Sequence, residues 1–306
     1  MVNQPFSTEG QEGLTAGDEF SALKAEADEF GITWDGSPAV ARGQVATTDG
    51  EVSFIRWGTA QPDIVLLHGL ALNAHTWDAF ALAAKRPLLA LDLPGHGSSA
   101  WRADGDYSAT AVAPAVAEVV DQVTQGPVTL VGQSLGGLTS LAVGALRPDR
   151  VARLVLVDVS PGMSGGNQVR SFLAGPEVFS SRDEIVQRAR SFGFGHSRES
   201  VARGVWHNTV VREDGSVVWK HHVGNSGGGL RLGGDFSALW APLENFPGPV
   251  LLVRGERGFL SPENLSELRR RVPSAQVVEV PSGHNVQEDS PVVLAEVVNR
   301  FVSTTP

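Results

Sequence analysis

The 306-residue chain contains no cysteine, which excludes disulfide bonds and thiol chemistry and fits a reducing compartment. It also has no apolar run as long as a membrane span. The first ten residues show neither a basic start nor an apolar core, so we expect no signal peptide and a cytoplasmic location.

Positive charge is scarce as well. The 24 Lys and Arg residues against 34 Asp and Glu give a formal net charge of −10, which disfavours binding to nucleic acid or to an anionic membrane. No pair of histidines has a convincing metal-ligand spacing with a nearby acidic residue, so we expect no metal and no cofactor. The composition leaves the oligomeric state open.

Short, continuous apolar runs are what the chain does have. They lack strict alternation, which predicts strands covered on both faces in a mostly parallel sheet. Amphipathic helices are expected between them, for example over residues 107–123. This alternation of strand and helix predicts a doubly wound α/β fold. The predicted strands fall within residues 62–69, 86–97, 127–131, 153–158, 249–254 and 276–280.

Ser134 follows one of these strands and precedes an apolar helix. Gly132 and Gly136 flank it and remove the Cβ atoms that would collide in a tight strand–helix turn. A serine in this setting predicts a nucleophile elbow, with its hydroxyl at the carboxyl edge of the sheet and the amino end of a helix. The alternative is an ordinary glycine-rich turn.

Four motifs in this order resemble the α/β-hydrolase family. The resemblance covers about residues 43–161 and 239–306, and it implies an α/β-hydrolase fold with a helical cap insertion. The motifs are His68-Gly69-Leu70, Asp92-Leu-Pro-Gly-His-Gly97, Gly132-Gln-Ser134-Leu-Gly136 and Gly283-His284-Asn-Val-Gln-Glu-Asp289.

The family's catalytic roles carry over to particular positions of this chain. Ser134 resembles the nucleophile and His284 the general base, while the backbone N–H groups of Leu70 and Leu135 resemble the oxyanion hole. A serine needs such a base because its hydroxyl is a weak nucleophile at neutral pH.

The third member of the triad departs from the usual pattern. In the family the acid commonly follows the strand that is here 249–254, but this chain has Gly258-Phe259 where a Ser-Asp pair is expected, and a phenyl ring cannot orient an imidazole or stabilise imidazolium. Some members take the acid from the end of the preceding strand, where this chain has Asp158. We favour Asp158 as the acid. Glu256, or no working acid at all, is the alternative.

Two segments lie outside the core pattern. Residues 1–42 are expected to be an extension with one helix at 18–30, and residues 162–238 a cap inserted between the core segments 43–161 and 239–306. In the cap we expect helices from Ser181 and from Ser197 or Ser200, and a hairpin at Asp214-Gly215. The aromatic candidates for the pocket wall are Trp77, Trp206 and Trp219.

The resemblance implies a serine hydrolase that cleaves small to medium carboxylic esters through an acyl-enzyme. The same triad serves lactone, amide or carbon–carbon bond hydrolysis, which stay open. Two further classes also remain: a cofactor-free dioxygenase, which keeps a similar serine–histidine pair, and a receptor that binds a ligand in the pocket with little turnover.

Overall fold

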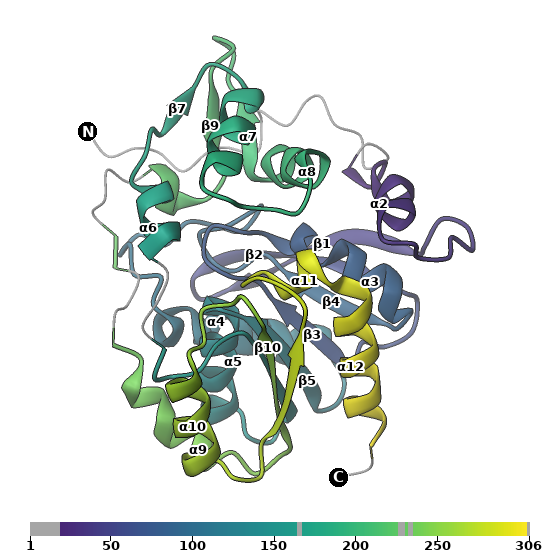
Figure 1. The fold of residues 1–306 in the computed structure, drawn as a ribbon, viewed down its shortest axis with the longest axis vertical. Helices are drawn as coiled ribbons and strands as arrows, with labels where there is room; N and C mark the ends of the chain where they lie inside the picture. Colours follow the sequence, from purple (N-terminus) through teal and green to yellow (C-terminus); the bar gives the residue numbers. More distant parts are fainter. Residues whose placement is uncertain (1–18, 164–166, 226–229, 232–234, 305–306) are drawn as a thin grey trace.

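The computed structural model describes residues 19–163, 167–225, 230–231 and 235–304, and its centre is an eight-stranded sheet (Figure 1). The strand order is β1-β2-β4-β3-β5-β6-β10-β11. Strand β2 runs antiparallel to both neighbours and the remaining pairs are parallel, which confirms the mostly parallel sheet. The bounds are Val40–Thr47 (β1), Gly50–Trp57 (β2), Ile64–Leu67 (β3), Leu88–Leu91 (β4), Val128–Gln133 (β5), Val151–Val157 (β6), Val250–Gly255 (β10) and Gln276–Val280 (β11).

Helices cover both faces of this sheet, as the continuous apolar strands predicted (Figure 1). In β3, Val65 and Leu67 join the buried cluster on one face, whereas Ile64 and Leu66 join the cluster on the other. The first face is covered by α4 (Ala109–Val123), α5 (Leu135–Leu146), α9 (Trp240–Glu244) and α10 (Pro262–Arg271). The second is covered by α3 (Asp78–Ala84), α11 (Val286–Asp289) and α12 (Pro291–Ser303).

Residues 167–225 form a separate layer above the carboxyl end of the sheet (Figure 1). A small antiparallel sheet in the order β7-β9-β8 packs with helices α7 and α8 around a buried cluster of its own. The expected hairpin is confirmed, since β8 and β9 pair antiparallel on either side of Gly215, which has a φ of +82°. The bounds are Asn167–Leu173 (α6), Val178–Phe179 (β7), Arg182–Ser191 (α7), Arg198–Asn208 (α8), Thr209–Val211 (β8) and Val217–Trp219 (β9).

Both predicted helix starts in this layer are confirmed. The Ser181 hydroxyl accepts a hydrogen bond from the Glu184 N–H at the start of α7, and Ser197 and Ser200 form a reciprocal capping box at the start of α8. At the start of α7 the Glu184 carboxylate accepts from the backbone N–H and the hydroxyl of Ser180.

The amino-terminal helix is shorter than expected. Helix α2 spans Leu23–Glu29 rather than 18–30, and residues 1–18 lie outside the described part of the chain. Leu23 and Ala27 are buried against the core, so α2 is fixed to the same face as α3 and α12. None of the helices in the described ranges has the length and apolar character that crossing a membrane requires.

Candidate active site

Ser134 lies in the sharp turn between β5 and α5 that the elbow motif predicts. Its φ of +51° is in the left-handed region, and its N–H donates to the Val157 carbonyl at 3.2 Å. The flanking glycines are required by space: a Cβ on Gly132 would lie 2.3 Å from the Gly136 carbonyl oxygen, and a Cβ on Gly136 would lie 2.1 Å from that of Leu67. Only glycine fits at these two positions, and the turn places Ser134 at the amino end of α5.

His284 and Asp158 meet at the carboxyl edge of the sheet. The Nδ1 atom of His284 lies 2.7 Å from Oδ2 of Asp158, which is fully buried. Since a carboxylate accepts, Nδ1 of His284 is the donor in this contact. Two backbone N–H groups fix the same carboxylate: Gly255 donates to Oδ1 at 3.1 Å and Phe259 donates to Oδ2 at 2.7 Å.

The loop after β10 is shaped to receive the Asp158 carboxylate. A Cβ on Gly258 would lie only 2.2 Å from Oδ1 of Asp158, so the glycine just before the position where the family pattern places the acid leaves room for the Asp158 carboxylate. The Phe259 ring stacks on the His284 imidazole with centroids 3.8 Å apart and an interplanar angle of 16°. The Phe259 ring therefore contacts the imidazole, while the hydrogen bond to Nδ1 comes from Asp158. Glu256, the alternative acid, is exposed.

A cavity of about 650 Å³ opens between the sheet and the layer formed by 167–225. Ser134 and His284 both line it, as do Leu70 and Leu135. Across the described ranges, neither the Leu70 N–H nor the Leu135 N–H donates to a protein acceptor, so both remain available to an oxygen atom of a ligand.

The three tryptophan candidates occupy different surroundings. Trp219 lines the cavity and makes edge contacts with Phe172 and Phe179. Trp77 is fully buried in the core against Phe80, and it is not part of the wall. Trp206 is half-buried outside the wall, with the Arg182 guanidinium 5.9 Å above its ring.

Helix α2 and the residues on either side of it contribute a part of the cavity wall that sequence reasoning missed. Glu19, Leu23, Glu26 and Phe30 line the cavity although they precede Ser134 by more than 100 residues. Burial and the neighbouring Asp78 carboxylate raise the pKa of Glu26 to about 8. This wall is therefore polar on one side, and Glu26 is mostly neutral at pH 7.

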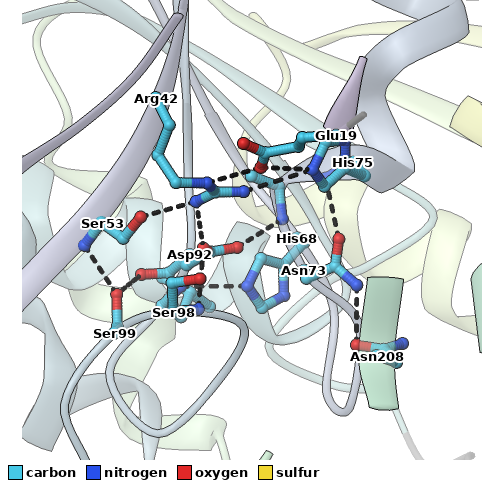
Figure 2. Close-up of polar contacts among 12 residues, drawn as sticks. Glu19, Arg42, Ser53, His68, Asn73, His75, Asp92, Ser98, Ser99 and Asn208 are labelled. Carbon is cyan, nitrogen blue, oxygen red and sulfur yellow. Dashed lines mark hydrogen bonds and ion pairs between the residues drawn. The ribbon is translucent and has the colours of Figure 1, made fainter. Parts of the chain in front are cut away.

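The segment before Ala74 is anchored to the core by buried polar groups (Figure 2). His68 accepts from the Leu93 N–H at 3.0 Å through Nε2, so its Nδ1–H donates to the Gly69 carbonyl at 2.7 Å. The Ala74 N–H donates to Asp92 at 2.7 Å. Burial raises the pKa of Asp92, but the Arg42 guanidinium and backbone N–H donors outweigh it and lower the value to about 2.

A cluster of His75, Asp78 and His207 brings potential ligand atoms within 4.8 Å of one another. Sequence spacing did not reveal it, because His207 comes from α8. Both nitrogens of His75 are engaged, with Asp78 at 2.7 Å and Glu19 at 2.9 Å, and its ring is stacked on that of His207 at 3.6 Å. Burial lowers the pKa of His75, but Asp78 and Glu19 raise it to about 9. Through these contacts with two carboxylates, His75 joins the cluster to a buried ion-pair network.

Known proteins are similar to this chain in sequence and in fold. The family model for the alpha/beta hydrolase fold matches residues 62–291. The esterase Rv0045c of Mycobacterium tuberculosis is 35% identical over 95% of this chain and 98% of its own, and its crystal structure superposes with a TM-score of 0.80 at 36% identity, covering 95% of this chain and 100% of that one. The sn-1-specific diacylglycerol lipase ABHD11 of Mus musculus is 29% identical over 79% of this chain and 81% of its own.

The matched region contains β3 to β11 and all four sequence motifs on which the resemblance was based. The sheet order, the elbow at Ser134 and the similarity to the esterase over nearly the whole chain agree with one another. This chain is a member of the α/β-hydrolase family.

Proposed function

We propose that this protein hydrolyses small to medium carboxylic esters, with Ser134 as nucleophile, His284 as general base and Asp158 as the acid. The observation that carries the proposal is the 2.7 Å contact between His284 and the buried Asp158 in a cavity that Ser134 also lines. The similarity to a named esterase over 95% of the chain supports it.

The geometry suits an acyl-enzyme mechanism. As Ser134 Oγ attacks the ester carbonyl, its proton passes to Nε2 of His284, and the Asp158 carboxylate stabilises the imidazolium that forms. The N–H groups of Leu70 and Leu135 hold the developing oxyanion. His284 then protonates the leaving alcohol, and a water molecule activated by the same base releases the acid from Ser134.

The cavity supports a limit on substrate size. Its volume of about 650 Å³ falls within the roughly 300–1,000 Å³ of small-molecule sites. We propose residues 162–238 as the cap over this cavity, residues 1–42 as an extension whose helix completes the wall, and 43–161 with 239–306 as the core. Phe172, Phe194 and Trp219 supply an apolar surface for the acyl group.

Composition supports the remaining parts of the proposal. A net charge of −10 favours a small-molecule partner over nucleic acid or an anionic membrane. The absence of cysteine from the sequence fits a cytoplasmic location.

The direct test is Ser134→Ala on p-nitrophenyl esters of increasing acyl length. We expect a loss of at least about 10³-fold in kcat, because the nucleophile is deleted, with the folded structure retained. Ser266→Ala is the matched control, since it removes an exposed helical hydroxyl whose bond is to the Pro262 carbonyl. Ser134→Ala turnover close to that of the wild type would contradict the mechanism, and efficient hydrolysis of emulsified long-chain triglyceride would contradict the size limit.

A further inference from the structure

The turn that carries the Leu70 N–H has a strained backbone. The Leu72 N–H donates to the Gly69 carbonyl at 3.2 Å, which makes Leu70 and Ala71 the central residues of a β-turn. Ala71 has a φ of +62°, a region that favours glycine. An alanine stays in this conformation only where the surrounding contacts hold it there.

The contact that holds Ala71 comes from the layer above the sheet. Asn208, the last residue of α8, donates from Nδ2 to the Ala71 carbonyl at 3.1 Å. Its own backbone carbonyl accepts from the Lys220 N–H at 2.7 Å, which ties Asn208 to the segment after β9. Within the described ranges, no side chain other than that of Asn208 hydrogen-bonds the backbone of residues 70–72.

Asn73 fixes the orientation of the Asn208 amide (Figure 2). The His75 N–H donates to Oδ1 of Asn73 at 2.9 Å, so the Asn73 amide nitrogen faces Asn208 and donates to its Oδ1 at 2.7 Å. Asn208 must therefore present Nδ2 to the Ala71 carbonyl. Asn73 and Asn208 are 4% and 7% exposed, so water competes little for these bonds.

We infer that Asn208 is a positioning residue that holds the Ala71 carbonyl and thereby aims the Leu70 N–H at the oxyanion, an inference that rests on the proposed function. His68 fixes the turn at Gly69 and Asp92 fixes it at Ala74. Asn208 fixes the residue between them. The oxyanion hole is consequently complete only while α8 keeps its position above the turn. The Asn208–Ala71 hydrogen bond therefore links enclosure of the substrate to stabilisation of the transition state.

Loss of such a positioning contact should lower kcat and leave KM little changed. The charge on the carbonyl oxygen develops during attack, so a misdirected N–H weakens the transition state more than the bound ester. Deleting one oxyanion-hole donor costs roughly 10²–10³ in kcat in other hydrolases, and a donor that is displaced rather than deleted should cost less.

The test is Asn208→Asp, which keeps the acceptor for Asn73 and puts a carboxylate oxygen in place of the donor to Ala71. With p-nitrophenyl butyrate we expect kcat to fall about 10- to 100-fold and KM to stay within about threefold. Asn299→Asp is the matched control: Asn299 also donates to a carbonyl at 3.1 Å, that of Ala84, away from the cavity. It should keep the wild-type kcat.

Amide hydrogen exchange over residues 69–72 gives a second readout that needs no turnover. We expect faster exchange in Asn208→Asp and wild-type exchange in Asn299→Asp. If the wild type hydrolyses no ester, the proposed function fails while the exchange still tests whether Asn208 holds the turn. Unchanged exchange, a kcat within twofold of the wild type, or an effect confined to KM would each overturn the inference.

If Asn208→Asp does not fold, Asn73→Ser carries the test. Serine still accepts from the His75 N–H but deletes the amide that orients Asn208. We expect the same pattern, a lower kcat with KM little changed and faster exchange at 69–72, at a smaller magnitude. Wild-type kcat and exchange in this variant would overturn the inference.

Discussion

The two sides of the proposed active site are held by different parts of the molecule. On the histidine side, Asp158 and His284 are fixed by loops that leave neighbouring strands, and the loops after β10 and β11 bond to each other through Arg257 and Ser282. On the oxyanion side, the turn after β3 is fixed by Asn208 from α8, and His75 just beyond it by Glu19.

The difference lies in which segments hold each side of the site. The loops on the histidine side follow strands of the parallel sheet, so formation of the sheet also positions Asp158 and His284. The oxyanion side depends on segments far away in sequence, so displacement of α8 or of the segment before α2 should impair it while Asp158 and His284 stay paired.

The largest effect is expected on the histidine side. Asp158→Asn places an amide against His284, which leaves the imidazole in the wrong tautomer and its cation without a counter-charge. The equivalent change in a serine protease costs about 10⁴ in turnover, and we expect at least about 10² here, because p-nitrophenyl esters have good leaving groups. Steady-state kinetics at matched folded fraction measures it.

Glu256→Gln is the control for that substitution. Glu256 is exposed, so kcat of this variant should change by less than about threefold. A damaging Glu256→Gln beside a mild Asp158→Asn would reverse the assignment of the acid.

A smaller loss should follow when the Asp158 carboxylate is displaced rather than replaced. Gly258→Ala puts a Cβ 2.2 Å from Oδ1 of Asp158, so the carboxylate must move from His284. We expect kcat to fall roughly 10-fold, since the charge remains nearby, and stability to fall by about 1–3 kcal/mol through overpacking. Gly126→Ala, where a Cβ meets nothing within 4 Å, should leave kcat unchanged. Equal behaviour of the two variants would show that the loop is not shaped around Asp158.

The smallest effect is expected on the oxyanion side, where alkaline pH should lower the free energy of unfolding. The pKa of His75 is raised from 6.5 to about 9, so the stability from its charged form is fully present below about pH 6.5 and is lost as pH rises through 9. This group accounts for up to about 3 kcal/mol of the free energy of unfolding. Glu26, with its pKa raised to about 8, acts in the same direction over a window from about 4.5 to 8.

Glu19→Gln isolates the contribution of His75, because it removes one of the two carboxylates that raise this pKa. Urea unfolding at pH 7 and pH 9.5 should show a smaller loss of stability for the variant than for the wild type. The same loss in both proteins would contradict the assigned role of Glu19.

The histidine side could be predicted from sequence because its signals are local. Ser134, Asp158 and His284 each follow a recognisable apolar strand, and parallel strands bring their carboxyl ends to one edge. The continuous apolar runs also predicted the sheet, and Gly132 and Gly136 around Ser134 predicted the elbow. The stacking of Phe259 on His284 was not predicted, because the sequence revealed only that an acid was missing there.

The oxyanion side and the cavity wall could not be predicted in this way. Asn208 and Ala71 are 137 residues apart, and a single polar residue at a helix end has no periodic signal that indicates its partner. Trp77 illustrates the same limit, since its position after the oxyanion segment suggested the cavity, while the structure buries it in the core.

The central claim is that ester hydrolysis passes through an acyl group on Ser134. Rapid quenching of the wild type with p-nitrophenyl butyrate, followed by peptide mass spectrometry, tests it most directly. We predict a butyryl adduct on the peptide that carries Ser134, accumulating further in a variant with slowed deacylation such as Asp158→Asn, and no adduct in Ser134→Ala. Full turnover without any adduct on Ser134, or with the adduct on another residue, would contradict the mechanism.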